Sequence, residues 1–364
     1  MSHYERRLQH DLDEIRRRVA GVGVRVEDAI RFAVHALVSG DSKLANDIAI
    51  NDLAINRATR DIDRQCHAFV AQHLPSAGHL RFVSSVLRLT VFLERIGDHA
   101  VTIARESQQL SGPLTPEMGR DIELMADQAR SMLHQAMQAW NEENAELARG
   151  TKGMADQVEK TQHLALNDLL SPAAREGRGM LDTLAIFVVF SSLERVSDQA
   201  KNICEETVFT LTGQTKPPKV YKVLFVDGGG DGLSAMAQAI AAKLYPNSGA
   251  YSCAGVAPAG AFAPALVATA DRLGLTLSGE GPTALPATEG ELSAFHVIVG
   301  LEAGLQERLP RVPFHTAYLE WDRVSFPVDA AGEAASSEAL DTLYRELAHD
   351  VGELMVKLRG EGAS

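Results

Sequence analysis

The fold is decided by a stretch that occurs twice, as LERIGDHAVTI at residues 93–103 and as LERVSDQAKNI at residues 193–203. The two copies stand about a hundred residues apart, which is too long for a short solenoid repeat. This distance fits the duplication of a whole three-helix unit. In each copy a glutamate precedes an aspartate by four residues, so both carboxylates lie one turn apart on the same face of a helix.

These paired carboxylates, Glu94 with Asp98 and Glu194 with Asp198, are candidate metal ligands. Like charges at this spacing destabilise an isolated helix by roughly a few tenths of a kcal/mol, and a cation bound by both would reverse that cost. Oxygen ligands suit hard cations such as magnesium, calcium or manganese, and also iron. The alternative is an acidic face that only contacts solvent, because a duplication can also copy a neutral feature.

Residues 1–211 as a whole are predicted to be helical. Apolar residues recur every three or four positions, and proline and glycine fall mainly in short breaks at residues 74–78, 111–113 and 171–172. Such breaks are typical of turns between long antiparallel helices. Asp41 and the pair Thr115–Pro116 are expected to begin two of these helices. On the first repeated stretch and the turn before it, the residues expected to be buried are Leu89, Leu93, Ile96, Ala100 and Ile103.

The composition changes after residues 212–219, which have the character of an interdomain linker. A β-favouring run at residues 220–226 is followed by three glycines at 228–230 and a helical pattern at 234–244. A second strand is expected at 294–299 and a last helix at about 337–358. This order predicts a C-terminal α/β domain with a parallel sheet, which spans residues 220–364.

The repeated stretch resembles the signature of the PhoU family of phosphate-uptake regulators, and the resemblance covers residues 1 to about 212. It implies an all-α part made of two three-helix bundles, at residues 1–112 and 113–211, each with a multinuclear metal cluster. It also implies a role in repressing phosphate-starvation signalling. The partners that it implies are a phosphate transporter ATPase, a membrane sensor histidine kinase and a second copy of the chain in a homodimer.

The same resemblance draws on a helix that precedes each repeated stretch. In the second repeat the family's first acidic position falls on Ala155, so that Asp156 is a shifted substitute, and Thr102 stands where the second repeat has Asn202. The metal implied is iron, magnesium, manganese or zinc. The implied ligands are Asp52, Asn56, Glu94, Asp98, Asp156, Glu159, Glu194, Asp198 and Asn202.

The C-terminal domain is similar to the low-molecular-weight phosphatase and arsenate reductase family at residues 223–226, 234–239, 252–255 and 274–279. That family opens its loop with a cysteine nucleophile and closes it with an arginine. Here these positions hold Asp227 and Leu233, so neither a thiolate nor a guanidinium is available. We therefore expect an inactive domain, a pseudophosphatase, with a phosphorylated Asp227 as the alternative.

The family's late Asp-Pro general acid has only a loose substitute, in Trp321-Asp322 followed by Phe326-Pro327. The lone Cys253 is expected to be a small buried residue and not a replacement nucleophile.

The bulk composition excludes several other functions. A formal net charge of -13 argues against nucleic-acid binding. The charged N-terminus and the lack of a long apolar run predict a cytoplasmic protein. A di-iron oxidase would need Glu-x-x-His pairs, but Gly97 and Ser197 occupy the histidine positions. We predict a metal-binding, non-enzymatic regulator of phosphate uptake and signalling. The alternatives are an enzyme, either a residual phosphatase or a metal-dependent hydrolase, and a metal-binding scaffold.

Overall fold

The computed structural model describes residues 3–73, 75–171, 179–215, 219–279, 281–323 and 337–360. The chain divides into two compact units, Met1–Lys216 and Pro217–Ser364. The boundary between them falls within the stretch that the sequence marks as a linker.

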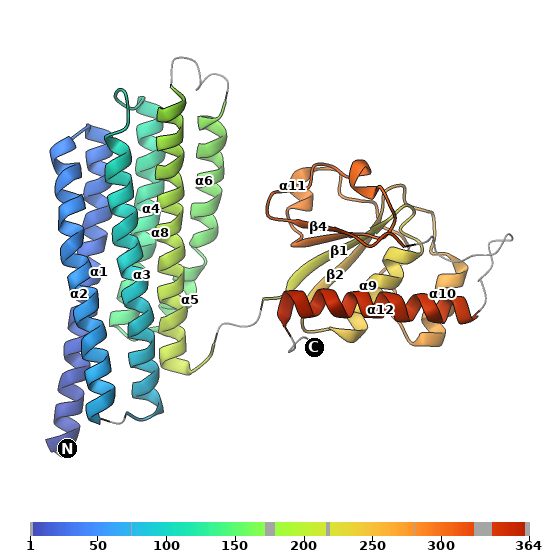
Figure 1. The fold of residues 1–364 in the computed structure, drawn as a ribbon, viewed down its shortest axis with the longest axis horizontal. Helices are drawn as coiled ribbons and strands as arrows, with labels where there is room; N and C mark the ends of the chain where they lie inside the picture. The colour runs from blue at the N-terminus through green and yellow to red at the C-terminus, as the bar shows by residue number, and fades with distance from the viewer. Residues whose placement is uncertain are drawn as a thin grey trace. The chain divides into compact units, whose positions relative to one another are not determined.

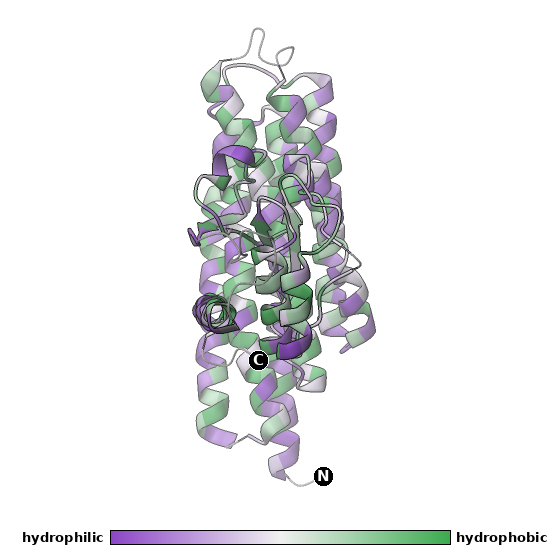
Figure 2. Ribbon diagram, turned by 90° about the vertical axis from the view of Figure 1, so that its right-hand side faces the viewer, coloured by the Kyte–Doolittle hydropathy of each residue, from purple (hydrophilic) through white to green (hydrophobic). Residues whose placement is uncertain are grey.

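The first unit is built of long helices that lie side by side (Figure 1). Their apolar residues face inward, and Figure 2 shows hydrophobic and hydrophilic residues alternating along each helix. Its described helices are α1 (His3–Ser39), α2 (Ser42–His73), α3 (Ala77–Ser107), α4 (Pro116–Asn141), α5 (Ala145–Lys152), α6 (Ala155–Leu169) and α8 (Met180–Thr212).

The helix starts predicted from the sequence are confirmed. The Asp41 carboxylate accepts the backbone N–H of Leu44 at 3.0 Å, at the beginning of α2. The Thr115 hydroxyl accepts the N–H of Met118 at 3.3 Å, and Pro116 occupies the first turn of α4. All five residues expected to be buried on α3 have no exposed surface, which confirms the side that this helix turns to the core.

The middle helix of the second repeat differs from its counterpart in the first. Where α2 is continuous, the second repeat has two shorter helices, α5 and α6. Gly153 is the C-terminal cap of α5. Its N–H donates to the carbonyl oxygen of Gly150 at 3.2 Å, and the N–H of Met154 donates to that of Thr151 at 3.0 Å. A new helix begins at Ala155. The duplicated sequence therefore does not give two identical helical units.

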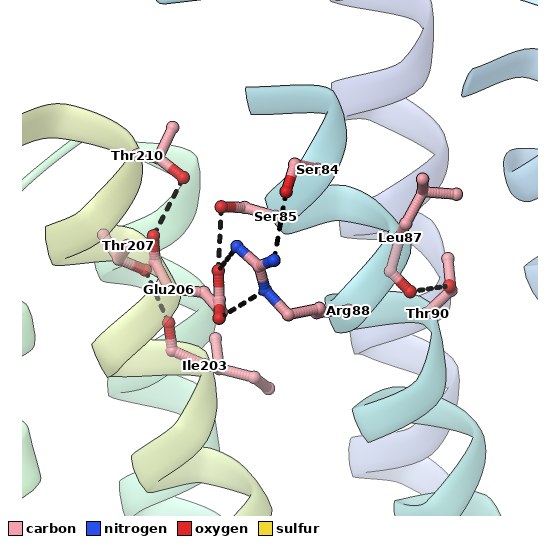
Figure 3. Close-up of polar contacts among 9 residues, drawn as sticks. All are labelled: Ser84, Ser85, Leu87, Arg88, Thr90, Ile203, Glu206, Thr207 and Thr210. Carbon is pink, nitrogen blue, oxygen red and sulfur yellow. Dashed lines mark hydrogen bonds and ion pairs between the residues drawn. The ribbon is translucent and has the colours of Figure 1, made fainter. Parts of the chain in front are cut away.

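The helices α3 and α8 pack against each other and join the two repeats. The Arg88 guanidinium on α3 donates to both carboxylate oxygens of Glu206 on α8, at 2.6 and 2.7 Å, and the Ser85 hydroxyl donates to the same carboxylate at 2.8 Å (Figure 3). At the other end, the Ser111 N–H donates to Asp182, near the start of α8, at 3.0 Å. These two contacts show that the helices are antiparallel.

The offset of one hundred residues between the repeats makes Glu106 the counterpart of Glu206 and Val188 the counterpart of Arg88. The counterpart of Arg88 is therefore a valine, and burial raises the pKa of Glu106. The duplication kept the glutamate at both ends of the interface but kept the arginine at one end alone.

The second unit contains the parallel sheet that the sequence predicted, and its strand order is β2-β1-β3-β4. The strand expected at residues 294–299 begins later, at Val297, because a turn in which Phe295 donates to the Leu292 carbonyl occupies the preceding residues. The last helix, α12, matches its predicted range closely. The elements are β1 (Tyr221–Asp227), α9 (Leu233–Leu244), β2 (Gly249–Gly255), α10 (Pro264–Leu273), α11 (Glu289–Leu292), β3 (Val297–Gly300), a 3-10 turn (Leu305–Arg308), β4 (Ala317–Glu320) and α12 (Ser337–Arg359).

Within the described ranges, no helix is both long enough and apolar enough to cross a membrane.

Candidate functional sites

The first candidate site lies between α2 and α3. The Asn56 side-chain amide donates to Asp52 at 2.8 Å, and the pKa of Asp52 is raised by burial and by the charges of Asp98 and Glu94. The structure therefore brings together the four residues that the sequence assigned to this site. One carboxylate oxygen of Asp52 and the amide oxygen of Asn56 are buried and receive no hydrogen bond from the described residues. Two acceptors are thus open to a donor or a cation.

Gly97 makes room for this arrangement. A Cβ atom at this position would stand 2.8 Å from the Asp52 Oδ1 atom. It would also stand 3.5 and 3.6 Å from two methyl carbons of the Ile55 side chain. Beside Gly97 and Asp52 lies a cavity of about 280 Å³ between α1, α2 and α3, whose lining includes Phe32 and Val101. Sequence reasoning missed the role of Gly97. The signal that could have revealed it is the exchange of this glycine for Ser197 in the second copy.

The second candidate site lies between α6 and α8. The pKa of Glu194 is raised to about 7, first by burial and then by the charge of Asp198, a hydrogen bond to Asp198 and the charge of Glu159, while the Arg195 charge opposes the rise. The Glu159 side chain is 64% exposed and lies 3.9 Å from His163. The structure brings Glu159, Glu194 and Asp198 together. Asp156 is exposed and is not among the groups whose charges shift the pKa of Glu194.

Asn202 lies one turn beyond Asp198 on α8 and is half-buried. Within the described ranges, no three His, Cys, Asp or Glu side chains form a ready-made set of metal ligands. A cation at the first site would therefore also use the Asn56 amide oxygen. The donor set of that site consists of oxygens alone and fits magnesium, manganese or iron. It offers no sulfur or imidazole of the kind that structural zinc sites use.

The glycine-rich loop of the α/β unit contains a buried carboxylate. Asp227 ends β1 and is only 3% exposed. One of its oxygens accepts the N–H of Gly230, and the other accepts the N–H of Ser234 at 2.8 Å, in the first turn of α9. A bound anion at a helix N-terminus would use N–H groups of this kind. In this loop the chain's own carboxylate uses them.

The loop is also closed from outside by the segment that follows β2. A Cβ atom at Gly255 would stand 2.4 Å from the carbonyl carbon of Gly229, so the two backbones are in direct contact. Burial raises the pKa of Asp227, and the N–H groups of Ser234 and Gly230 oppose this rise. Asp227 and Leu233, at the positions that the sequence assigned to the nucleophile and the arginine, are both buried.

Cys253 does not supply the missing nucleophile. It is buried on β2, and burial together with the Asp227 charge raises its pKa to about 11. The thiol is therefore protonated at neutral pH and is not the reactive form. Of the loose Asp-Pro substitute, Asp322 lies in a left-handed backbone conformation with φ 42°, and Phe326-Pro327 lies outside the described residues.

Comparison with known proteins finds relatives of the helical unit. The PhoU domain profile matches residues 19–107 and 122–207. A PhoU homolog of the phosphate-specific transport system from Pseudomonas putida is 31% identical over 212 residues, which cover 58% of this chain and 83% of the relative. The crystal structure of PhoU from Pseudomonas aeruginosa aligns with a TM-score of 0.54 at 30% identity, over 57% of this chain and 99% of that chain.

The phosphate transport system regulatory protein PhoU from Streptococcus pneumoniae gives a TM-score of 0.53 at 27% identity, over 57% of this chain and 99% of that chain. Smaller α/β proteins align more weakly. Wzb from Vibrio vulnificus, solved with benzylphosphonate, gives a TM-score of 0.31 at 19% identity, over 38% of this chain and 100% of that chain. These last values are too low to carry an argument about activity.

Proposed function

The chain belongs to the PhoU family, and from this premise we propose that it is a non-enzymatic regulator of phosphate uptake and of phosphate-starvation signalling. The observation that carries this proposal is the duplicated helical unit, which the PhoU profile matches in both repeats. The relatives are accessory proteins of phosphate-specific transport. The proposed partners are the ATPase of a phosphate transporter and a membrane sensor histidine kinase, with the protein in the cytoplasm as a homodimer.

Metal binding is the second part of the proposal. In the first repeat, Asp52, Asn56, Glu94 and Asp98 would hold a divalent or transition metal ion, and the ion would neutralise their mutual repulsion. Support comes from the two buried oxygens that receive no hydrogen bond from the described residues. It also comes from the raised pKa of Asp52, since burial and its two acidic neighbours both disfavour its charge. A cation favours the ionised form of such a group.

The third part is that the α/β unit is catalytically silent. A phosphatase of the related type needs an open cradle of N–H groups for the oxyanion and a thiolate to attack. Asp227 uses N–H groups of this cradle, and both of its oxygens are engaged and buried. The same engagement argues against Asp227 as a phosphate acceptor, because its carboxylate would have to leave the loop before it could attack.

Cells provide the test of the regulatory role. The chain's own gene is deleted and replaced by variants, and phosphate uptake is measured together with a reporter of phosphate-starvation genes at high phosphate. We expect the double variant Glu94→Ala, Asp98→Ala to switch the reporter on. The matched control is Glu106→Gln, which removes a carboxylate from the same helix outside the site. A deletion strain whose uptake and reporter both equal those of the wild type would contradict the proposal.

Hydrolysis of p-nitrophenyl phosphate and reduction of arsenate test the enzyme alternative. The full chain is compared with Asp227→Asn, which keeps an oxygen acceptor in the loop. We expect both proteins to show the background rate. Turnover by the wild type that disappears in the variant would make the α/β unit an enzyme and would reject this part of the proposal.

A further inference from the structure

We propose that the chain holds metal in the first repeat alone, and that the second repeat has lost the residues that complete a metal site. This inference rests on the metal binding proposed above and assigns it to one half of a duplicated structure. Three differences between the repeats carry it: a lost carboxylate, a filled space and a changed use of the remaining acids.

The lost carboxylate is the counterpart of Asp52. Asn56 of α2 corresponds to Glu159 of α6. The charge of Glu159 raises the pKa of Glu194, just as the charges of Glu94 and Asp98 raise the pKa of Asp52. Four residues upstream of Glu159 stands Ala155, a buried residue in the core, where the first repeat has Asp52. Asp156 is the next acid along the helix, but a shift of one residue turns a side chain by about 100°. Asp156 is accordingly exposed.

The filled space is the counterpart of Gly97. In the first repeat, a Cβ atom at Gly97 would stand 2.8 Å from the Asp52 Oδ1 atom, so a side chain at this position would require the carboxylate to move. In the second repeat, the same position holds Ser197, whose hydroxyl donates to the backbone carbonyl of Glu194 at 2.7 Å. Aspartate opposite glycine has thus become alanine opposite serine. The two changes fit each other, because in the first repeat it is the glycine that leaves space for the aspartate.

The remaining acids of the second repeat are used differently. Glu194 and Asp198 form a hydrogen bond with each other, and Glu159 extends into solvent near His163. None of these three side chains has a buried oxygen that lacks a partner, in contrast to Asp52 and Asn56. In addition, Lys201 stands where the first repeat has Val101 in the cavity lining. The second repeat therefore satisfies its acids from within, and the first does not.

Manganese binding by the full chain tests this inference. Protein stripped with EDTA is titrated with Mn²⁺, and free Mn²⁺ is followed by electron paramagnetic resonance. We expect the wild type to show binding that Asp52→Ala removes and that Glu194→Ala leaves unchanged. We expect Gly97→Ser to weaken Mn²⁺ binding by roughly 10–100-fold, because a residue that positions a metal ligand affects the metal affinity to this extent.

A gain of Mn²⁺ binding in the second repeat is the more decisive result. The double variant Ala155→Asp, Ser197→Gly restores the missing pair in the second repeat, and we expect it to add a second site that Glu194→Ala then removes. Circular dichroism and thermal unfolding establish that each variant is folded. The rise in melting temperature on adding Mn²⁺ gives an independent readout.

The outcomes separate the two claims. Equal loss of Mn²⁺ binding in Asp52→Ala and Glu194→Ala would overturn the one-sided assignment and leave metal binding in place. Binding that only Glu194→Ala removes would overturn it in the same way. Wild-type protein that takes up neither Mn²⁺ nor Fe²⁺ would reject the metal proposal itself, and this inference with it.

Discussion

Asp52 in the helical unit and Asp227 in the α/β unit are both shielded from solvent at least in part, but their carboxylate oxygens differ in their hydrogen bonds. Asp52 accepts one hydrogen bond from Asn56, while its other oxygen is buried without a donor among the described residues. Asp227 accepts backbone N–H groups with both oxygens. An acceptor without a donor favours a cation, whereas a satisfied acceptor stabilises the fold. The first carboxylate is therefore suited to binding, and the second to structure.

The largest expected effect comes from Asp227→Ala. The change leaves the N–H groups of Gly230 and Ser234 without their acceptor, and each buried unsatisfied group costs about 1–3 kcal/mol. We expect the α/β unit to lose about 2–4 kcal/mol of unfolding free energy. Denaturant unfolding is followed by the fluorescence of Trp321, which packs on Phe225 with ring centroids 5.9 Å apart. A Trp140→Phe background removes the other of the chain's 2 tryptophans.

Asp231→Ala is the matched control for Asp227→Ala. It removes the same charge from the same loop, where the described N–H groups of Gly230 and Ser234 donate to Asp227 and not to Asp231. We expect a loss below about 0.5 kcal/mol, as for a surface substitution. Equal losses in the two variants would show that stability depends on the charge of the loop and not on the hydrogen bonds that Asp227 accepts.

A smaller loss is expected from Arg88→Ala in the helical unit. The change removes a bidentate ion pair with Glu206 and leaves that carboxylate with the hydrogen bond from Ser85. Charge-assisted pairs of this geometry contribute more than exposed ones, and we expect a loss of about 1–2 kcal/mol. Unfolding of the helical unit is followed by Trp140 fluorescence in a Trp321→Phe background.

Glu106→Ala provides the comparison for Arg88→Ala at the other end of the same interface. Because the repeat has Val188 where the first end of the interface has Arg88, removal of the Glu106 carboxylate should change stability by less than about 0.5 kcal/mol. A loss as large as that of Arg88→Ala would mean that Glu106 has a stabilising partner of its own.

The pH dependence of the metal-free helical unit should depend on Glu194. Its pKa is about 7 in the folded protein against an ordinary value of 4.5, so the folded state holds this proton more tightly than the unfolded state. Stability is then lost as the pH rises from about 4.5 to about 7, and this loss is complete above that range. We expect the melting temperature of EDTA-treated protein to fall between pH 5 and pH 8, and the fall to be smaller in Glu194→Gln.

An unchanged slope in Glu194→Gln would assign the pH dependence to other groups. Asp52 and Glu106, whose pKa values are also raised by burial, would contribute with the same sign.

The smallest expected effect has the opposite sign. Asp52→Asn should stabilise the metal-free helical unit by about 0.5 kcal/mol, because it removes a charge that Glu94 and Asp98 repel. Thermal unfolding in EDTA measures the gain, and the exposed Asp47→Asn on the same helix is the control. A loss of stability in Asp52→Asn, together with no change in Asp47→Asn, would mean that Asp52 acts as a structural acceptor like Asp227.

The sequence by itself determined the features that depend on residues close together in the chain. Apolar periodicity predicted the helices and the buried side of α3, since one turn of helix brings residues three and four apart to the same face. The repeated stretch predicted the paired acids, and the exchange of cysteine for Asp227 predicted a loop without its nucleophile. Strand β3 was placed too early because the turn before it also contains apolar residues, Ala294 and Phe295.

The tertiary structure decided what each acid does. Arg88 and Glu206 are 118 residues apart in the chain, and no local pattern identifies one as the partner of the other. In the same way, only the packing of α2 on α3 showed that Gly97 leaves space for Asp52, and only the folded loop showed that Asp227 uses its own N–H groups. Hydrogen bonds and burial depend on atoms that folding brings together from distant parts of the chain, so the sequence specifies the carboxylates while the fold decides whether each is open to a ligand.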